Sequence, residues 1–186
     1  MPTIAIPYFS GTGTTKLVAE SIAAGSGGTL MPILGSQIIE GRFKDADFLG
    51  KLDAADTIIF GAATYMGGPA AQFKAFADAT GERWFGRKWS GKLAAGFTSS
   101  GSPSGDKSIT LQYFVTLAMQ HGMLWLGQDI IAQQNTGTPY DQALNRLGSH
   151  TGLMAQMDGK PGMVSAADLA TAKAFGERIK AFTAKR

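Results

Sequence analysis

The chain has 186 residues, no cysteine, two histidines and a formal net charge of +3. The lack of cysteine excludes a disulfide framework, a thiolate metal site and a cysteine nucleophile, and two histidines argue against a histidine-rich metal site, so we expect no metal. Apolar runs stay well below the roughly 20 residues of a membrane span, and the N-terminus does not resemble a signal peptide. We therefore expect a cytoplasmic protein that binds neither membrane nor nucleic acid, since its Lys and Arg residues are scattered.

The first third of the chain predicts two strands and at least one helix. Residues 3–9 are apolar and lead into a Gly-rich turn, as in a buried strand, although Pro7 removes a ladder hydrogen bond. A helical period follows from Thr14 to about Ala24, and we expect Gly25 to end it. Residues 29–34 indicate a second strand, and the mixed stretch 35–55 leaves room for a helix around 46–52.

The remainder of the chain continues to alternate between short apolar runs and helical periods. The expected elements are strand 56–62, helix 69–79, strand 92–98, helix 106–120, strand 123–126, a polar loop over 133–148, and a helix from Ser165 to about Thr183. This alternation predicts an α/β fold with a parallel sheet, right-handed crossovers and helices on both faces. One domain is expected to cover residues 1–186.

Three loops are candidates for a ligand site. In an open parallel sheet, ligands bind at the carboxyl ends of the strands beside the topological switch point. For a five-stranded sheet of order 2-1-3-4-5, loops 10–15, 63–68 and 99–105 meet there. All three are rich in glycine, and the first and third also carry hydroxyl groups, so together they indicate a site for an oxygen-rich anion.

The first loop, Ser-Gly-Thr-Gly-Thr-Thr over residues 10–15, precedes a predicted helix. Free amides at a helix N-terminus, together with four hydroxyl groups, are suited to a phosphate. The dinucleotide fingerprint fails because Lys16 replaces its third glycine, and the Walker pattern fails because no Gly-Lys-Ser/Thr follows. The loop therefore favours a single terminal phosphate, with an ordinary helix cap and tight turn as the alternative.

A family resemblance rests on several segments in order. Residues 8–15, with Ala19 and Ile22, resemble the FMN-phosphate signature of flavodoxin-like proteins. Residues 58–68 resemble the flavin-edge loop of the WrbA-type NAD(P)H:quinone oxidoreductases, also called tryptophan-repressor-binding proteins. The same family is matched by residues 91–94, 99–105, 116–118, 121–123 and 137–140.

The resemblance implies a flavodoxin-like fold in three layers, with FMN as cofactor. The cofactor-binding residues that it implies are Ser10, Gly11, Thr12, Gly13, Thr14, Thr15, Ala63, Thr64, Tyr65, Met66, Gly67, Gly68, Ser99, Ser100, Gly101, Ser102 and Gly105. It also implies a catalytic His121 near the reactive face of the flavin, and Trp84 approaching that flavin from a neighbouring subunit. Without the resemblance, the sequence indicates only that His121 lies at a helix end, where it could contact terminal carbonyls, and that Trp84 is a packing or interface residue.

This chain departs from the family pattern at three places. Ala63 stands where the family usually has proline, and residues 35–55 are shorter than the usual segment. Tyr65 occupies a place where relatives can carry a basic residue. This difference affects the expected contacts with substrate and nicotinamide, not those with FMN.

The resemblance implies an NAD(P)H:quinone oxidoreductase. Hydride would pass from NADH or NADPH to FMN, and two electrons would then pass to a quinone or similar small electrophile in ping-pong order, in a homo-oligomer, dimer or tetramer. A flavodoxin-type one-electron carrier is the alternative, but such carriers are typically acidic and this chain is basic. A transcriptional role finds no helix-turn-helix or basic stripe to support it.

Overall fold

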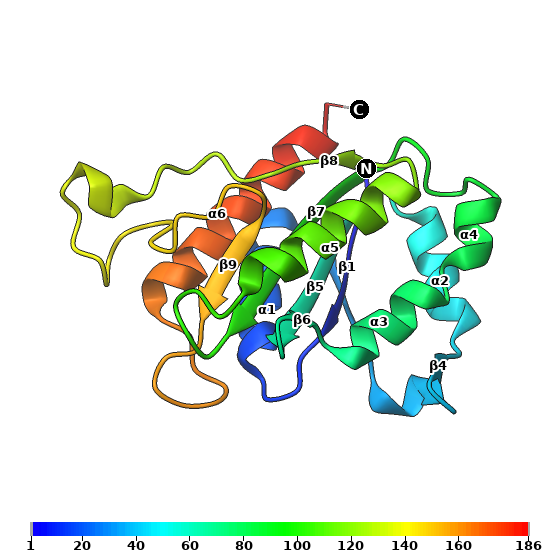
Figure 1. Cartoon of the computed structure of the whole chain (residues 1–186). Coiled ribbons are helices and arrows are strands. Elements are labelled where there is room, and N and C mark those ends of the chain that lie inside the picture. The colour runs from blue at the N-terminus through cyan, green and yellow to red at the C-terminus, as the bar shows by residue number, and fades with distance from the viewer. Residues whose placement is uncertain (1, 186) are drawn as a thin grey trace.

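The computed structural model describes residues 2–185 and shows a central sheet built almost entirely of parallel strands (Figure 1). The main strand order is β2-β1-β5-β7-β8, which is the expected order 2-1-3-4-5. The strands on this path are β1 (Ile4–Phe9), β2 (Thr29–Pro32), β5 (Thr57–Tyr65), β7 (Leu93–Ser100) and β8 (Leu124–Trp125). Two further strands join it: β6 (Gly68–Pro69) pairs antiparallel with β5, and β9 (Leu153–Gln156) pairs parallel with β7.

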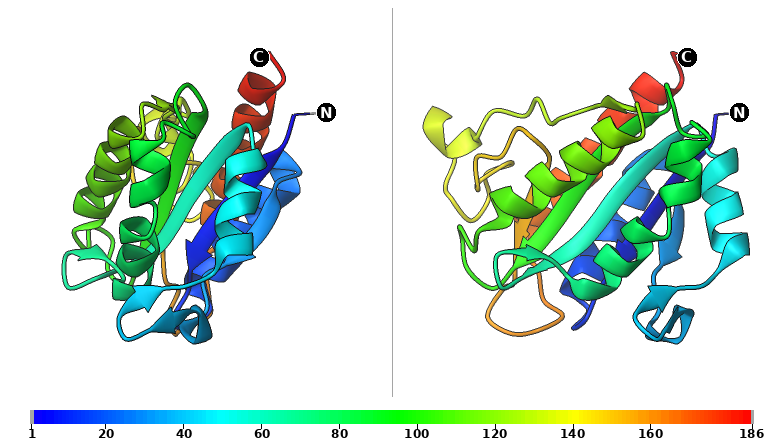
Figure 2. Two further views of the ribbon diagram at one scale, coloured as in Figure 1. Left: turned by 90° about the vertical axis from the view of Figure 1, so that its right-hand side faces the viewer. Right: turned by 45° about the vertical axis from the view of Figure 1, so that its right-hand side comes forward.

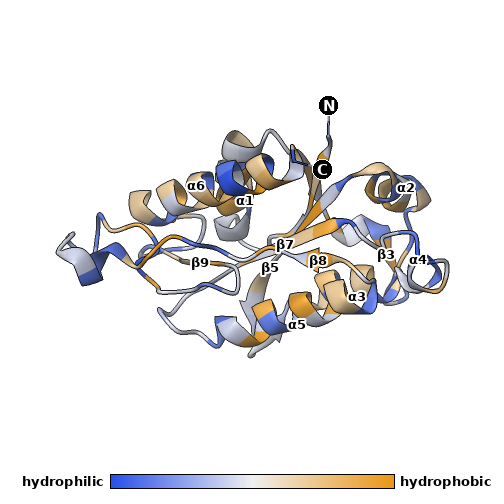
Figure 3. Cartoon of the chain, turned by 90° about the horizontal axis from the view of Figure 1, so that it is seen from above, coloured by the Kyte–Doolittle hydropathy of each residue, from blue (hydrophilic) through white to orange (hydrophobic). Residues whose placement is uncertain are grey.

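Helices cover both faces of the sheet, which confirms the doubly wound α/β prediction (Figures 2 and 3). One face is covered by α1 (Thr14–Ser26) and α6 (Ala166–Thr183). The other face carries α2 (Ala46–Ala54), α3 (Ala71–Asp78) and α5 (Lys107–Gln120), and the short α4 (Gly81–Phe85) follows α3. The chain therefore has the three layers of a flavodoxin-like fold.

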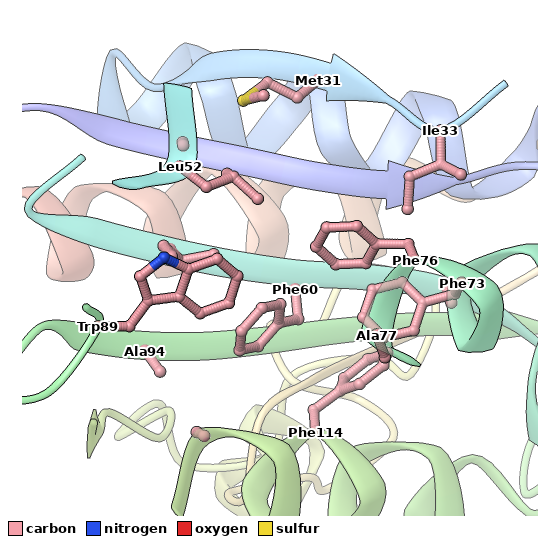
Figure 4. Packing of buried hydrophobic residues seen from close by; sticks show 14 of the residues in the cluster. Met31, Ile33, Leu52, Phe60, Phe73, Phe76, Ala77, Trp89, Ala94 and Phe114 are labelled. Atoms are coloured by element: carbon pink, nitrogen blue, oxygen red, sulfur yellow. The ribbon is translucent and has the colours of Figure 1, made fainter. Parts of the chain in front are cut away.

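Aromatic side chains fill the core between the sheet and the helices α2, α3 and α5 (Figure 4). Phe73 and Phe114 lie 4.7 Å apart between ring centroids, and Phe60 packs edge-on against Phe73 at 6.2 Å. Trp89 is fully buried in the same cluster, and its indole Nε1 donates to Asp53 Oδ1 at 2.8 Å. This bond satisfies the one polar group that the indole brings into the core.

The helices α1 and α6 pack closely because each contributes a glycine to the contact. A Cβ on Gly25 would lie 2.1 Å from Lys173 O, and a Cβ on Gly176 would lie 2.3 Å from Ile22 O. This contact corrects the expectation that Gly25 ends the first helix: α1 continues to Ser26, and Gly27, with φ of 72°, forms its C-cap. The glycine serves helix packing rather than helix termination.

The fifth strand position is shared by two short segments. Strand β8 pairs with the beginning of β7 (Leu93↔Leu124), whereas β9 pairs with its end (Phe97↔Leu153). Residues 127–152 run between them and project from the sheet as the yellow segment of Figure 1, with one 3₁₀ turn, η2 (Gln133–Thr136). The expected strand 123–126 and the loop 133–148 are therefore present, but β9 was missed.

Other boundaries differ in ways that affect the site. Strands β5 and β7 extend to Tyr65 and Ser100, into stretches expected to be loop. The mixed stretch 35–45 contains η1 (Gly35–Gln37) and a hairpin of β3 (Ile38–Ile39) and β4 (Arg42–Phe43). Pro7 lies inside β1, opposite Met31 of β2, and the register between β1 and β5 is the same before and after it (Ala5↔Ile58 and Tyr8↔Gly61). No helix in residues 2–185 is long and apolar enough to cross a membrane.

Candidate functional site

The loops at the carboxyl ends of β1, β5 and β7 meet around a cavity of about 210 Å³, at the lower edge of the sheet in Figure 1. This is the edge where the sequence predicts the site. The cavity is lined by Thr12, Thr14, Thr15, Ala63, Thr64, Tyr65, Ser99, Ser100, Gly101, Met157 and Pro161. All but the last two come from the three predicted loops, and none of these lining residues is acidic.

The first loop presents amides and hydroxyls toward this edge. Ser10 Oγ accepts from Gly13 N at 3.2 Å and from Lys16 N at 3.1 Å, which closes the turn before α1. Gly13 has φ of 95°, a left-handed conformation that glycine adopts without strain. The bond from Leu17 N to Gly13 O closes the first turn of α1. The amides of Thr14 and Thr15 come before it, among the N-terminal amides that an α-helix leaves without a partner inside the helix.

These groups fit a phosphate without a side-chain cation. Amides and the positive end of the helix dipole favour a dianion at this position, and the hydroxyl groups of residues 12 and 14 add donors. The side chain of Lys16 turns away to Glu20, 3.8 Å from it on the exposed face of α1. The chemistry of the loop therefore matches the terminal phosphate of FMN.

The second predicted loop is a strand end and a tight hairpin. Met66 and Gly67 have φ of 49° and 79° and form the two-residue turn between β5 and β6. Met66 is fully exposed at its tip. Tyr65 leans back over the first loop, because a Cβ built on Gly11 would lie 2.4 Å from the tyrosine hydroxyl. The hairpin and the phosphate loop thus form two adjoining walls of one cradle.

Buried hydroxyls fix the strand ends behind the cradle. Thr64 Oγ1 lies 2.8 Å from Thr98 Oγ1 and 2.7 Å from Thr110 Oγ1, which joins β5, β7 and α5. Thr15 Oγ1 lies 2.8 Å from Ser99 Oγ, which joins the phosphate loop to β7. The hydroxyl of Thr64 therefore bonds within the protein, although the residue also lines the cavity.

The third loop is held by a lysine that sequence reasoning missed. Lys107 Nζ donates to Ser100 Oγ, Ser102 O and Pro103 O at 2.8, 2.6 and 2.9 Å. The side chain is completely buried, and burial lowers its pKa to about 8. A lysine in the first turn of a helix, where the helix dipole disfavours a cation, is the sequence signal that could have identified it.

The loop after β9 adds a fourth wall that was also not predicted. Gly162 N donates to Thr14 Oγ1 at 3.1 Å, and Met157 N donates to Ser100 O at 2.9 Å. The Gly-Lys-Pro-Gly stretch of residues 159–162 is a turn signal that could have indicated it, had the preceding β9 been recognised.

The structure does not bring His121 to the cradle. His121 is the C-cap of α5. The residue after it, Gly122, accepts a hydrogen bond through its carbonyl oxygen from Gly91 N, just before β7 begins. The imidazole is 2% exposed, stacks on Trp89 at 4.5 Å and bonds to Thr80 Oγ1 at 2.9 Å. Within a single chain, α5 runs away from the carboxyl edge and carries its last residue to the opposite end of the sheet, so a role for His121 at the flavin stays a prediction.

The same geometry governs the protonation of His121. Thr80 Oγ1 donates to Ala77 O at 2.7 Å, so the histidine Nε2 is the donor in the bond to Thr80. Its Nδ1 is buried without a hydrogen-bond partner. Burial, aided by the charge of Arg87, lowers the pKa of His121 to about 4. The imidazole is neutral at pH 7 and acts as a packing residue within this chain.

Trp84 also lies away from the cradle of its own chain. It is on α4, 46% exposed, beside Phe85, which is 84% exposed. Within residues 2–185, no group of three or more His, Cys, Asp or Glu side chains is arranged to hold a metal ion.

Comparison with known proteins identifies the family of the chain. Residues 44–137 match the family model of the NADPH-dependent FMN reductases. The chain is 40% identical over 176 residues to flavodoxin FldP of Pseudomonas aeruginosa (strain UCBPP-PA14), covering 94% of this chain and 92% of the relative. It is 30% identical over 198 residues to an NAD(P)H dehydrogenase (quinone) of Archaeoglobus fulgidus, covering 96% of each.

A solved structure gives the same assignment. The flavodoxin, WrbA-like protein from Agrobacterium tumefaciens is 39% identical and superposes with a TM-score of 0.78, covering 100% of this chain and 99% of that one. Sequence and structure therefore agree on one family. The chain belongs to the NADPH-dependent FMN reductase family and is a WrbA-type, flavodoxin-like protein.

Proposed function

We propose that this protein is an FMN-dependent oxidoreductase that transfers two electrons from NADH or NADPH to a quinone or similar electrophile in ping-pong order. The whole chain would act as one FMN-binding domain. The observation that carries the proposal is the meeting of three loops, rich in hydroxyls and amides and without an acidic lining residue, around one cavity. A cytoplasmic location stays a prediction.

In this proposal, residues 10–15 hold the phosphate of FMN through amides and hydroxyls. Residues 63–68 form the wall beside the ring, with Tyr65 and Met66 as side-chain contacts, and residues 99–102 and Gly105 form the opposite wall. Bound FMN supplies the two-electron chemistry, so the chain needs to orient it, shield it from water and leave one face open. A lining without Asp, Glu, His, Lys or Arg is suited to that role.

The relatives support this reading in their names. The family description specifies an NADPH-dependent FMN reductase, and the archaeal relative is called an NAD(P)H dehydrogenase (quinone). One electron acceptor and one donor would share the open face in turn, which is the basis of the ping-pong order.

A one-electron carrier is the second candidate, because the relative that is 40% identical is named a flavodoxin. Such a carrier docks to redox partners through charged groups around its flavin. The lining of this cavity offers no carboxylate for that purpose, and the chain has a net charge of +3.

An anaerobic spectrum separates the two candidates. FMN-loaded protein is mixed with NADH and, separately, with NADPH, and the visible flavin absorbance is followed before and after benzoquinone is added. The oxidoreductase reading predicts rapid loss of absorbance with at least one donor and full recovery with benzoquinone. No reaction with either donor, together with two separate one-electron potentials in a potentiometric titration, would establish the carrier instead.

Self-association is part of the proposal because Trp84 and Phe85 leave apolar rings exposed on α4. In a homo-oligomer these rings would be covered by a second copy, and Trp84 would approach the cradle of its neighbour. Light scattering on wild-type protein and on Trp84→Ala tests this: a dimer or tetramer that dissociates in the variant supports it, and a wild-type monomer overturns it.

A further inference from the structure

Lys107 is a buried cation directly behind the cradle. Its side chain is 0% exposed, and it begins α5, where the positive end of the helix dipole disfavours a cation. Burial of a charge also costs free energy unless hydrogen bonds satisfy it. Contacts of the ammonium group must therefore offset both costs.

Those contacts all go to one loop. The three N–H groups of the ammonium are taken up by Ser100 Oγ, Ser102 O and Pro103 O. Ser100 and Gly101, where this loop begins, line the cavity. The loop is folded tightly, since a Cβ on Gly105 would lie 2.1 Å from Ser100 Oγ. The ammonium thus holds the loop in one conformation against the cradle.

The charge of Lys107 is not neutralised by a direct ion pair. Its three hydrogen-bond partners are all neutral oxygens. The other charged groups that act on it are Asp168 of α6 and Arg146 of the segment 127–152. These two pair with each other, with Arg146 Nε 2.7 Å from Asp168 Oδ1 and Nη2 3.0 Å from Oδ2. A net positive charge therefore remains behind the third loop.

We propose that Lys107 is a positioning residue for the cofactor: its ammonium group holds residues 100–103 against the ring side of the cavity, and its charge favours the reduced, negatively charged form of FMN. This inference rests on the proposed FMN site. A positive charge in a poorly solvated position stabilises a nearby anion more strongly than the same charge in water, and charge near the ring is one of the ways in which a protein tunes a flavin.

The test measures two dissociation constants, for oxidised FMN and for dithionite-reduced FMN, on wild type, Lys107→Met and Lys173→Met. Methionine keeps most of the apolar stem of the lysine but removes the charge. Lys173 is an exposed lysine on α6, 3.9 Å from the exposed Glu177, so its substitution removes one charge without touching the cradle. Thermal unfolding checks that each variant folds.

We expect Lys107→Met to weaken binding of oxidised FMN about tenfold and of reduced FMN about 100-fold, and Lys173→Met to change both less than twofold. Unchanged binding in Lys107→Met, or equal losses for the two redox forms, would overturn the inference. Failure of the wild type to bind FMN would instead overturn the proposed function.

A second measurement needs no variant that could fail to fold. Because burial lowers the pKa of Lys107 to about 8, with Asp168 raising it and Arg146 lowering it, the ammonium loses its proton as the pH rises above 8. We expect wild-type affinity for reduced FMN to fall about tenfold between pH 7 and pH 9.5, more than the affinity for oxidised FMN. Equal pH profiles for the two forms would contradict the inference.

Discussion

Gly11 and Tyr65 show how single residues shape the cradle. The phenol of Tyr65 occupies the space that a Cβ on Gly11 would need, so glycine at this position lets the phosphate loop and the β5–β6 hairpin adjoin without displacing Tyr65. Glycine also leaves the backbone free to approach a ligand closely. A phosphate site in this loop could be proposed from sequence because the groups that suit a phosphate all lie within residues 10–15.

We predict that Gly11→Ala weakens FMN binding about tenfold, which corresponds to about 1.4 kcal/mol, because the new methyl group displaces Tyr65 and crowds the phosphate loop. Stability should change little, since the clash is with the far end of an exposed side chain. Fluorescence titration with FMN measures the effect. Gly35→Ala, where a Cβ meets nothing within 4 Å, is the control and should bind FMN as wild type does. Wild-type affinity in Gly11→Ala would contradict the contact.

His121 illustrates what residue patterns leave undetermined. Its place before Gly122 is visible in the sequence, but the end of the sheet on which it lies depends on the direction in which α5 crosses the face. Lys107 lies at the other end of the same helix, beside the cradle; its place in the first turn of α5 is unusual for a cation, but that place alone does not indicate that the side chain is buried or which loop it holds.

At the scale of elements, continuous apolar strands were predicted well and interrupted ones were not. Strands β5 and β7 are buried on both faces and read as uninterrupted apolar runs. Strand β9 has only four residues and follows the long segment 127–152, so neither its length nor its spacing marks it as the second half of a strand position. Because β9 was not predicted, the loop after it, which contributes Met157 and Pro161 to the cavity, was not predicted either.

The packing of α1 on α6 depends on glycine at the helix contact. We predict that Gly176→Ala lowers the free energy of unfolding by about 2–3 kcal/mol, because its Cβ would lie 2.3 Å from Ile22 O and the helices would have to separate. Denaturant unfolding measures it. Gly50→Ala in α2 meets nothing within 4 Å and is the matched control, with a gain of up to about 1 kcal/mol from helix propensity. Equal effects of the two substitutions would argue against close helix contact.

At the scale of the whole molecule, the buried His121 makes stability depend on acid. Its pKa is about 4 in the folded protein and near 6.5 in the unfolded chain, so between these values the unfolded chain binds more protons. We predict that the contribution of His121 to the free energy of unfolding is fully present above pH 6.5. The free energy of unfolding then falls by on the order of 3 kcal/mol as the pH drops to 4.

Chemical unfolding at a series of pH values checks this dependence. His121→Gln retains a hydrogen-bonding amide near Thr80 but removes the titrating ring, so its curve should be flatter between pH 6.5 and 4. His150→Gln removes an exposed histidine and should keep the wild-type curve. A wild-type slope in His121→Gln would show that other groups produce the acid sensitivity.

The molecule as a whole places its candidate site at one edge of the sheet. The fold, the strand order and the edge that carries the site followed from sequence, since alternation of strands and helices permits few topologies. The contacts that complete the cradle, from Lys107 and from residues 157–162, arise only when distant segments fold together.

The most direct test of the FMN cradle compares FMN with riboflavin, which lacks only the phosphate. Titration of cofactor-free protein, followed by flavin fluorescence, gives both dissociation constants. Amides and hydroxyls at the N-terminus of α1 should hold FMN in a 1:1 complex about 100-fold more tightly than riboflavin, as expected for several charge-assisted hydrogen bonds. Equal affinity for the two flavins, or no binding of either, would contradict the account.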